Sequence, residues 1–201
     1  MKTFIQKYKL NIVSALTIMS LVAYSLIVSS LRYETNDDAT LSNIANGAFG
    51  SNSQDLIYIN IFLSCFIKLA HTAFPTINFV VFIQLALVFI SLYFIVLVIE
   101  EKFGIVTGTA ISIILFLPFS TELISKFQYV KTSTIIITAG LILIATNLSK
   151  TNIRMFIGYF LVIMGCQIRF ESFISTGALC AFTLLYYFFN LSRKDKVKAC
   201  V

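Results

Sequence analysis

Long apolar segments alternate with short polar ones along almost the whole chain. The apolar segments are approximately 10–31, 56–70, 77–99, 104–119, 132–148, 155–168 and 173–190. A helix needs about 20 predominantly apolar residues to cross a bilayer, and several of these segments reach that length. The pattern predicts an all-α protein, a polytopic membrane helical bundle.

The second segment, 56–70, differs from the others in length and in polarity. As a helix it would extend roughly 23 Å, against a hydrocarbon core of roughly 30 Å. It carries a polar stripe at helical spacing, formed by Asn60, Ser64, Lys68 and His71. We therefore expect it to lie at the membrane surface or to be re-entrant, which leaves about six transmembrane helices.

The polar stretch after the first span, residues 32–55, predicts a further short helix. Apolar residues recur there at i, i+3, i+4, i+7 and i+8, namely Leu41, Ile44, Ala45, Ala48 and Phe49. Asn36, Asp37 and Asp38 are natural N-caps for it, and Asp55 is one for the helix that follows. The first loop should hold two juxtamembrane helices, at approximately 39–49 and 55–71.

Composition and charge agree with a membrane protein and set its expected orientation. The chain is 58% hydrophobic and 12% charged, whereas soluble domains carry roughly 25% charged residues. With six spans, Lys and Arg divide ten to five in favour of the side that carries both termini. The positive-inside rule makes that side cytoplasmic. We expect one multi-pass domain over 1–201 in the cell membrane, with an extracytoplasmic first loop and no nucleic-acid partner for its net charge of +6.

The acidic pair Asp37 and Asp38 is the first candidate for chemistry. Adjacent carboxylates just above a membrane can act as a catalytic base or hold Mg²⁺ or Mn²⁺ against a phosphate. The competing interpretation is that they cap a helix in a solvated loop. The pair alone does not decide between the two.

Cations and one histidine on the same expected face are candidates for binding an anionic ligand. Arg169 and Glu171 fall between two apolar segments with almost no loop, and a guanidinium there suits bidentate phosphate binding. Lys131 faces outward against the charge rule, for which snorkelling is the alternative explanation. Lys68 and His71 belong to the same face, although a lone histidine on an amphipathic helix is more often an interfacial polar group.

The order of these features resembles one family. An outer loop, "NDDATLSNIANGAFG", is followed by a surface helix, "DLIYINIFLSCFIKLA", by "FPTINF" opening a long span, and later by a short outer "RFE". This order is similar to the N-terminal half of GT-C glycosyltransferases, which take a sugar from a polyprenyl-phosphate carrier. The resemblance implies that Asp37 and Asp38 are the acidic catalytic or metal-binding motif. It also implies that Arg169, and with it Lys131, contacts the donor phosphate.

Two other functions remain open from the sequence. A non-catalytic membrane partner or lipid-binding protein in envelope polysaccharide assembly would act with a partner chain or as a homo-oligomer. A small transporter or flippase is the third possibility. Segments 77–99 and 132–148 carry no charge, which disfavours an ionisable pathway through the membrane.

Overall fold

The computed structural model describes residues 2–50, 53–148 and 152–190. The helices are α1 (Lys2–Val28), α2 (Asn36–Ala45), α3 (Ile61–Ala73), α4 (Phe79–Phe103), α5 (Ile105–Ser120), α6 (Tyr129–Thr146), α7 (Ile153–Ile168) and α8 (Phe170–Asn190). A π-helical turn, Thr121–Ser125, and two short strands, β1 (Arg32–Tyr33) and β2 (Lys126–Phe127), complete these elements. The expected all-α polytopic bundle is confirmed, and the strand pair is a small addition to it.

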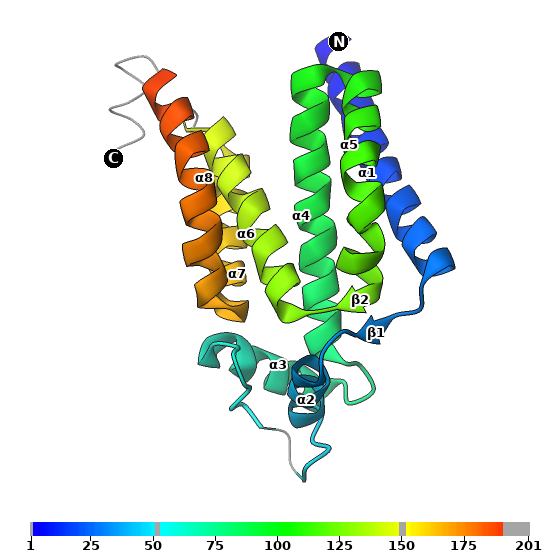
Figure 1. Ribbon diagram of the computed structural model, residues 1–201, viewed down its shortest axis with the longest axis vertical. Coiled ribbons are helices and arrows are strands. Elements are labelled where there is room, and N and C mark those ends of the chain that lie inside the picture. The colour runs from blue at the N-terminus through cyan, green and yellow to red at the C-terminus, as the bar shows by residue number, and fades with distance from the viewer. Residues whose placement is uncertain (1, 51–52, 149–151, 191–201) are drawn as a thin grey trace.

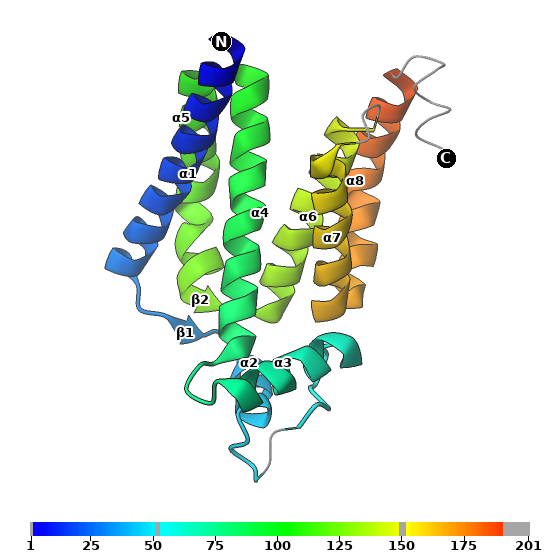
Figure 2. The same ribbon diagram turned by 180° about the vertical axis from the view of Figure 1, so that it is seen from behind.

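The helices have two orientations. Helices α1, α4, α5, α6, α7 and α8 run along the long axis of the molecule, whereas α3 lies across one end of them beside α2 (Figures 1 and 2). We call this end the loop end. The start of α1 and the end of α8 both lie at the opposite end, which we call the terminal end. That α3 rests on a membrane surface stays a prediction.

Among the described residues, length and composition identify five stretches that are long and apolar enough to cross a membrane, namely 8–28, 79–103, 105–125, 129–146 and 170–190. Helix α7, which we expected to cross as well, has 16 residues, and α3 has 13. Although short, α7 runs beside α6 and α8 along the same axis.

Local sequence explains where several helices begin. Asn78 caps α4 by accepting a hydrogen bond from the Val81 amide at 3.3 Å, and Asn152 caps α7 through the Met155 amide at 3.1 Å. Such caps satisfy amides that have no partner within the helix. Gly104, at φ 83°, separates α4 from α5 with a left-handed backbone that glycine adopts without a steric penalty.

The long helices pack as two groups of three, α1/α4/α5 and α6/α7/α8, joined where α4 meets α6. Ile136, Ile137 and Leu143 of α6 are fully buried in this arrangement. Helices α6 and α7 approach closely at a pair of glycines, because a Cβ atom on Gly158 would lie 2.9 Å from the Gly140 carbonyl oxygen. Small residues permit this kind of helix contact in membrane proteins.

The strand pair fastens the first loop to the start of α6. β1 pairs with β2 in parallel, and the Glu34 amide extends the pairing by donating to the Phe127 carbonyl oxygen at 2.9 Å. This pairing brings residues 32–38 beside residues 126–131, which are almost a hundred positions further along the chain.

Candidate functional site

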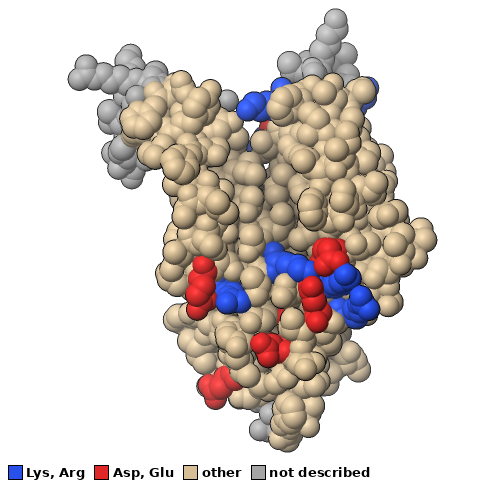
Figure 3. Space-filling model, in the orientation of Figure 1, with Lys and Arg blue, Asp and Glu red and all other residues tan. Residues whose placement is uncertain are grey.

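Charged side chains gather in a band at the loop end, where the long helices meet α2 and α3 (Figure 3). The candidate residues predicted from sequence belong to elements at this end. They come from α2, from α3, from the first turn of α6 and from the junction between α7 and α8: Asp37, Asp38, Lys68, His71, Lys131, Arg169 and Glu171. The fold thus collects four separate segments at one end of the bundle.

The two adjacent aspartates have different environments. Asp38 is only 4% exposed, and its Oδ1 accepts a hydrogen bond from the Tyr129 amide at 2.9 Å. Its Oδ2 accepts one from the Thr35 hydroxyl at 2.5 Å. Gln128, the residue before α6, makes no side-chain cap, so Asp38 caps α6 from another helix. A carboxylate is favourable at that position because the helix N-terminus carries a partial positive charge.

Asp37 is exposed and has no hydrogen-bond partner among the described residues. The pair therefore offers one free carboxylate at the surface, while the other is held inside the fold. No group of three or more His, Cys, Asp and Glu within the described ranges is placed to hold a metal ion. Binding of Mg²⁺ or Mn²⁺ stays a prediction from the sequence.

Arg169 lies over two stacked aromatic rings. Its guanidinium carbon is 5.4 Å from the ring centre of Tyr129 and 6.0 Å from that of Tyr58. Its Nε lies 3.5 Å from the carboxylate of Glu171, whose side chain is 71% exposed. The two Nη atoms have no hydrogen-bond partner among the described residues. The ring contacts orient the guanidinium by cation–π attraction and leave most of its donors free.

Tyr58 and Tyr129 form the support for this guanidinium. Their ring centres are 5.1 Å apart and their planes differ by 11°. Tyr58 has φ 68°, the left-handed region that a non-glycine residue rarely adopts. A strained backbone of this kind persists only where surrounding contacts hold it, and such sites cluster at ligand-binding positions.

Lys131 is neutralised by carboxylates of the protein. Its Nζ is 2.8 Å from Glu122 Oε2 and also pairs with Glu34. Glu122 in turn pairs with Lys126, so two lysines and two glutamates form one alternating network. The unusual placement of Lys126 and Lys131 thus has an explanation inside the fold. Of the predicted cations, Arg169 is more available to an anionic ligand than Lys131.

The two candidates on α3 lie differently. His71 is 6% exposed, and its Nδ1 donates to the Ile77 carbonyl oxygen at 3.3 Å in the tautomer that this contact requires. It therefore stabilises the connection between α3 and α4. Lys68 is half-buried, and its ammonium group has no ion-pair partner among the described residues. The polar stripe of α3 turns partly inward, since Ser64 is also buried, while Phe62 and Leu69 are exposed on the other side.

An apolar groove of about 450 Å³ lies between α3 and α7. Its lining residues are Phe62, Leu63, Phe66, Phe160, Ile163, Met164 and Gln167. Gln167 stands two residues before Arg169, and its backbone carbonyl accepts a hydrogen bond from the Asn60 amide at 2.8 Å. The groove is thus adjacent along the chain to Arg169.

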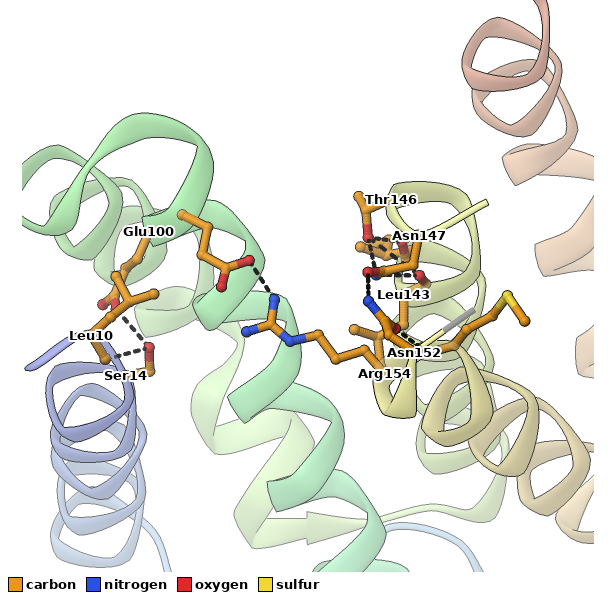
Figure 4. A network of polar contacts seen from close by, with 11 residues as sticks. Leu10, Ser14, Glu100, Leu143, Thr146, Asn147, Asn152 and Arg154 are labelled. Atoms are coloured by element: carbon orange, nitrogen blue, oxygen red, sulfur yellow. Dashed lines mark hydrogen bonds and ion pairs between the residues drawn. The ribbon is translucent and has the colours of Figure 1, made fainter. Parts of the chain in front are cut away.

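A second polar group lies at the terminal end and was not predicted as a site. Glu100 is 1% exposed and accepts hydrogen bonds from Ser14 at 2.6 Å and from Thr109 at 2.8 Å. The next residue, Glu101, pairs with Arg154 of α7 at 2.6 Å. Figure 4 shows the Arg154 side chain reaching from α7 to α4. Sequence patterns do not single out Glu100, because it stands at the polar boundary of an apolar segment.

Sequence reasoning also missed the roles of Tyr58 and Tyr129. Each is one of 9 tyrosines in an apolar chain, and only the fold stacks them. Comparisons with protein-family models, with curated proteins and with solved structures found no match to this chain.

Proposed function

We propose that this integral membrane protein is a GT-C-like glycosyltransferase that takes a sugar from a polyprenyl-phosphate carrier at the loop end. The observation that carries the proposal is the Arg169 guanidinium, held on the stacked rings of Tyr58 and Tyr129 with its Nη donors free. A guanidinium at the edge of a membrane matches the bidentate geometry of a phosphate group.

Asp37 is the base in this proposal. The acceptor hydroxyl oxygen forms a bond to the anomeric carbon, and the bond from that carbon to the phosphate oxygen breaks with its electron pair going to the phosphate. Asp37 takes the hydroxyl proton, because its carboxylate is exposed and unpartnered, whereas both oxygens of Asp38 already accept hydrogen bonds. Arg169 stabilises the negative charge that develops on the departing phosphate.

Asp38 has a positioning role in the same scheme. By capping α6 it fixes Tyr129, the first residue of that helix, whose ring supports Arg169. The apolar groove between α3 and α7 lies on the side of Gln167 and provides an apolar surface beside the phosphate site.

A second candidate, a non-catalytic lipid-binding protein, is favoured by the number of charges that are already paired. Lys131 is neutralised by Glu34 and Glu122, and Asp38 is committed to the fold. The unpartnered Nη donors of Arg169 suffice to bind a lipid phosphate, with or without transfer of a sugar. The two candidates share the Arg169 site and differ in what Asp37 does.

The experiment measures lipid binding and sugar transfer separately. Native mass spectrometry of the detergent-purified chain, with added undecaprenyl phosphate, should show a bound lipid that is lost in Arg169→Ala. Lys126→Ala is the matched control, because its side chain is 30% exposed against 28% for Arg169 and is also ion-paired at the loop end. Asp37→Asn should retain the lipid and lose transfer from a polyprenyl-phosphate sugar in vesicles.

Each part can fail on its own. Equal lipid retention in wild type and Arg169→Ala would refute the phosphate site. Undiminished transfer by Asp37→Asn would refute the base. A bound lipid with no transfer from any of several polyprenyl-phosphate sugars would favour the non-catalytic function.

A further inference from the structure

The two groups of long helices leave a hollow between them. One hydrophobic cluster joins the groups inside the bundle, because it holds Ile95 of α4 together with Leu143 of α6 and Leu161 of α7. Figures 1 and 2 show α6 meeting α4 near β2 and diverging from it towards the terminal end. Figure 3 shows the recess between the groups, which we call the interhelical hollow, with Lys or Arg side chains at both of its ends.

Two long side-chain contacts connect the groups at the terminal end. Arg154 of α7 reaches Glu101 of α4 at 2.6 Å (Figure 4). Lys102 of α4 reaches the Tyr187 hydroxyl of α8, with its Nζ 3.5 Å from the oxygen. Polar side chains thus connect the two helix groups at this end.

The ammonium group of Lys102 lies near two aromatic rings. Its Nζ is 5.8 Å from the ring centre of Phe103 and 5.9 Å from that of Tyr187. No carboxylate lies within ion-pair distance of it among the described residues, and its side chain is exposed. Cations and aromatic rings at the boundary of the hydrocarbon are characteristic of contacts with lipid head groups.

The net charge around this mouth of the hollow is positive. Lys102 and Arg154 face one nearby carboxylate, Glu101. Glu100 is turned away, since its oxygens bond to Ser14 of α1 and Thr109 of α5.

We propose that the interhelical hollow binds an anionic phospholipid, with its phosphate at Lys102 and Arg154 and an acyl chain between the two helix groups. Basic pockets between transmembrane helices are recognised sites for anionic lipid head groups. The lipid complements the cationic mouth, whereas a second copy of this chain would bring a further net charge of +6. This site lies at the opposite end of the bundle from Arg169 and does not depend on the proposed transferase activity.

The test is lipid retention by the full chain. The protein is placed in nanodiscs that contain equal amounts of phosphatidylglycerol and phosphatidylcholine with identical acyl chains, and the retained lipids are counted by native mass spectrometry after gentle release. Wild type should retain phosphatidylglycerol several-fold in excess, and Lys102→Gln should lower that ratio to near one. Lys9→Gln is the matched control, because Lys9 is an exposed cation near the same end on α1.

The opposite results are equally clear. Equal retention of the two lipids by wild type would refute the site. An equal loss with Lys9→Gln and Lys102→Gln would show that diffuse surface charge attracts the lipid and would refute the hollow. A dimer that carries no lipid would also refute the proposal, because a second copy of the chain would then occupy the hollow in place of the phospholipid.

Discussion

Replacing Asp38 with alanine should destabilise the protein far more than the same change at Asp37. Asp38→Ala removes two hydrogen bonds from a carboxyl group that is 4% exposed, to the Thr35 hydroxyl and the Tyr129 amide. The bond to the Tyr129 amide is also the cap of α6, for which Gln128 offers no substitute. Asp37 makes no hydrogen bond that the described structure would lose.

The magnitude follows from these contacts. A hydrogen bond to a charged group contributes roughly 1.5–3 kcal/mol, and loss of an N-cap costs about 1 kcal/mol. Because Thr35 is partly exposed and can bond to water instead, we expect the free energy of unfolding to fall by about 2–4 kcal/mol in Asp38→Ala. Asp38→Asn, which keeps an acceptor for the Tyr129 amide, should cost about 1 kcal/mol. Asp37→Ala should stay within about 0.5 kcal/mol of wild type.

The assay is thermal unfolding in detergent, followed by circular dichroism. For a chain of this length, 1 kcal/mol corresponds to roughly 2–4 °C in Tm, so Asp38→Ala should lower Tm by roughly 5–15 °C. A Tm for Asp38→Ala that stays within about 2 °C of the wild-type Tm would correspond to a loss of about 1 kcal/mol or less. That result would refute the structural role of this carboxylate. Equal losses in the two alanine variants would show that the aspartates share one environment, contrary to the structure.

Two further predictions concern helix packing. Gly158→Val should cost about 1–3 kcal/mol, because its Cβ would lie 2.9 Å from the Gly140 carbonyl oxygen. Gly177→Ala, where a Cβ meets nothing within 4 Å, is the control, and equal Tm values for both variants would contradict the close contact between α6 and α7. Glu100→Ala should cost about 2–3 kcal/mol and Glu100→Gln about 1 kcal/mol, since glutamine still accepts a hydrogen bond. The same thermal assay measures both, and an unchanged Glu100→Ala would show that Ser14 and Thr109 do not depend on this carboxyl.

The positions of the helices could be predicted from the sequence alone. A run such as 77–99 has no charge and is long enough to form a buried helix whatever surrounds it, and α4 begins at Phe79 as that run suggests. Capping residues such as Asn78 act within a few positions of themselves. Boundaries shifted by a few residues, most clearly for α3, which begins at Ile61 rather than near 55, because helix ends depend on neighbouring elements as well as on local pattern.

Sequence patterns singled out the charged residues that the fold brings to the loop end, but neither the tyrosines beside Arg169 nor the different environments of the two aspartates. Asp37 and Asp38 are neighbours in sequence, yet successive side chains on a helix point about 100° apart, so only one of the two faces the interior. The partner that distinguishes them, the Tyr129 amide, is 91 positions away. Lys131 illustrates the same limit, because the carboxylate of Glu34 that neutralises it is 97 positions away.

The sequence by itself thus determined that the chain is a bundle of apolar helices whose candidate residues lie in the short polar segments between them. Those properties depend on composition and on periodicity, which are local. Only the tertiary structure decided that Arg169 rests on Tyr58 and Tyr129, and that Asp37 is free while Asp38 is held. These properties depend on contacts between distant segments, whose geometry is set by how the helices pack and not by any one stretch of residues.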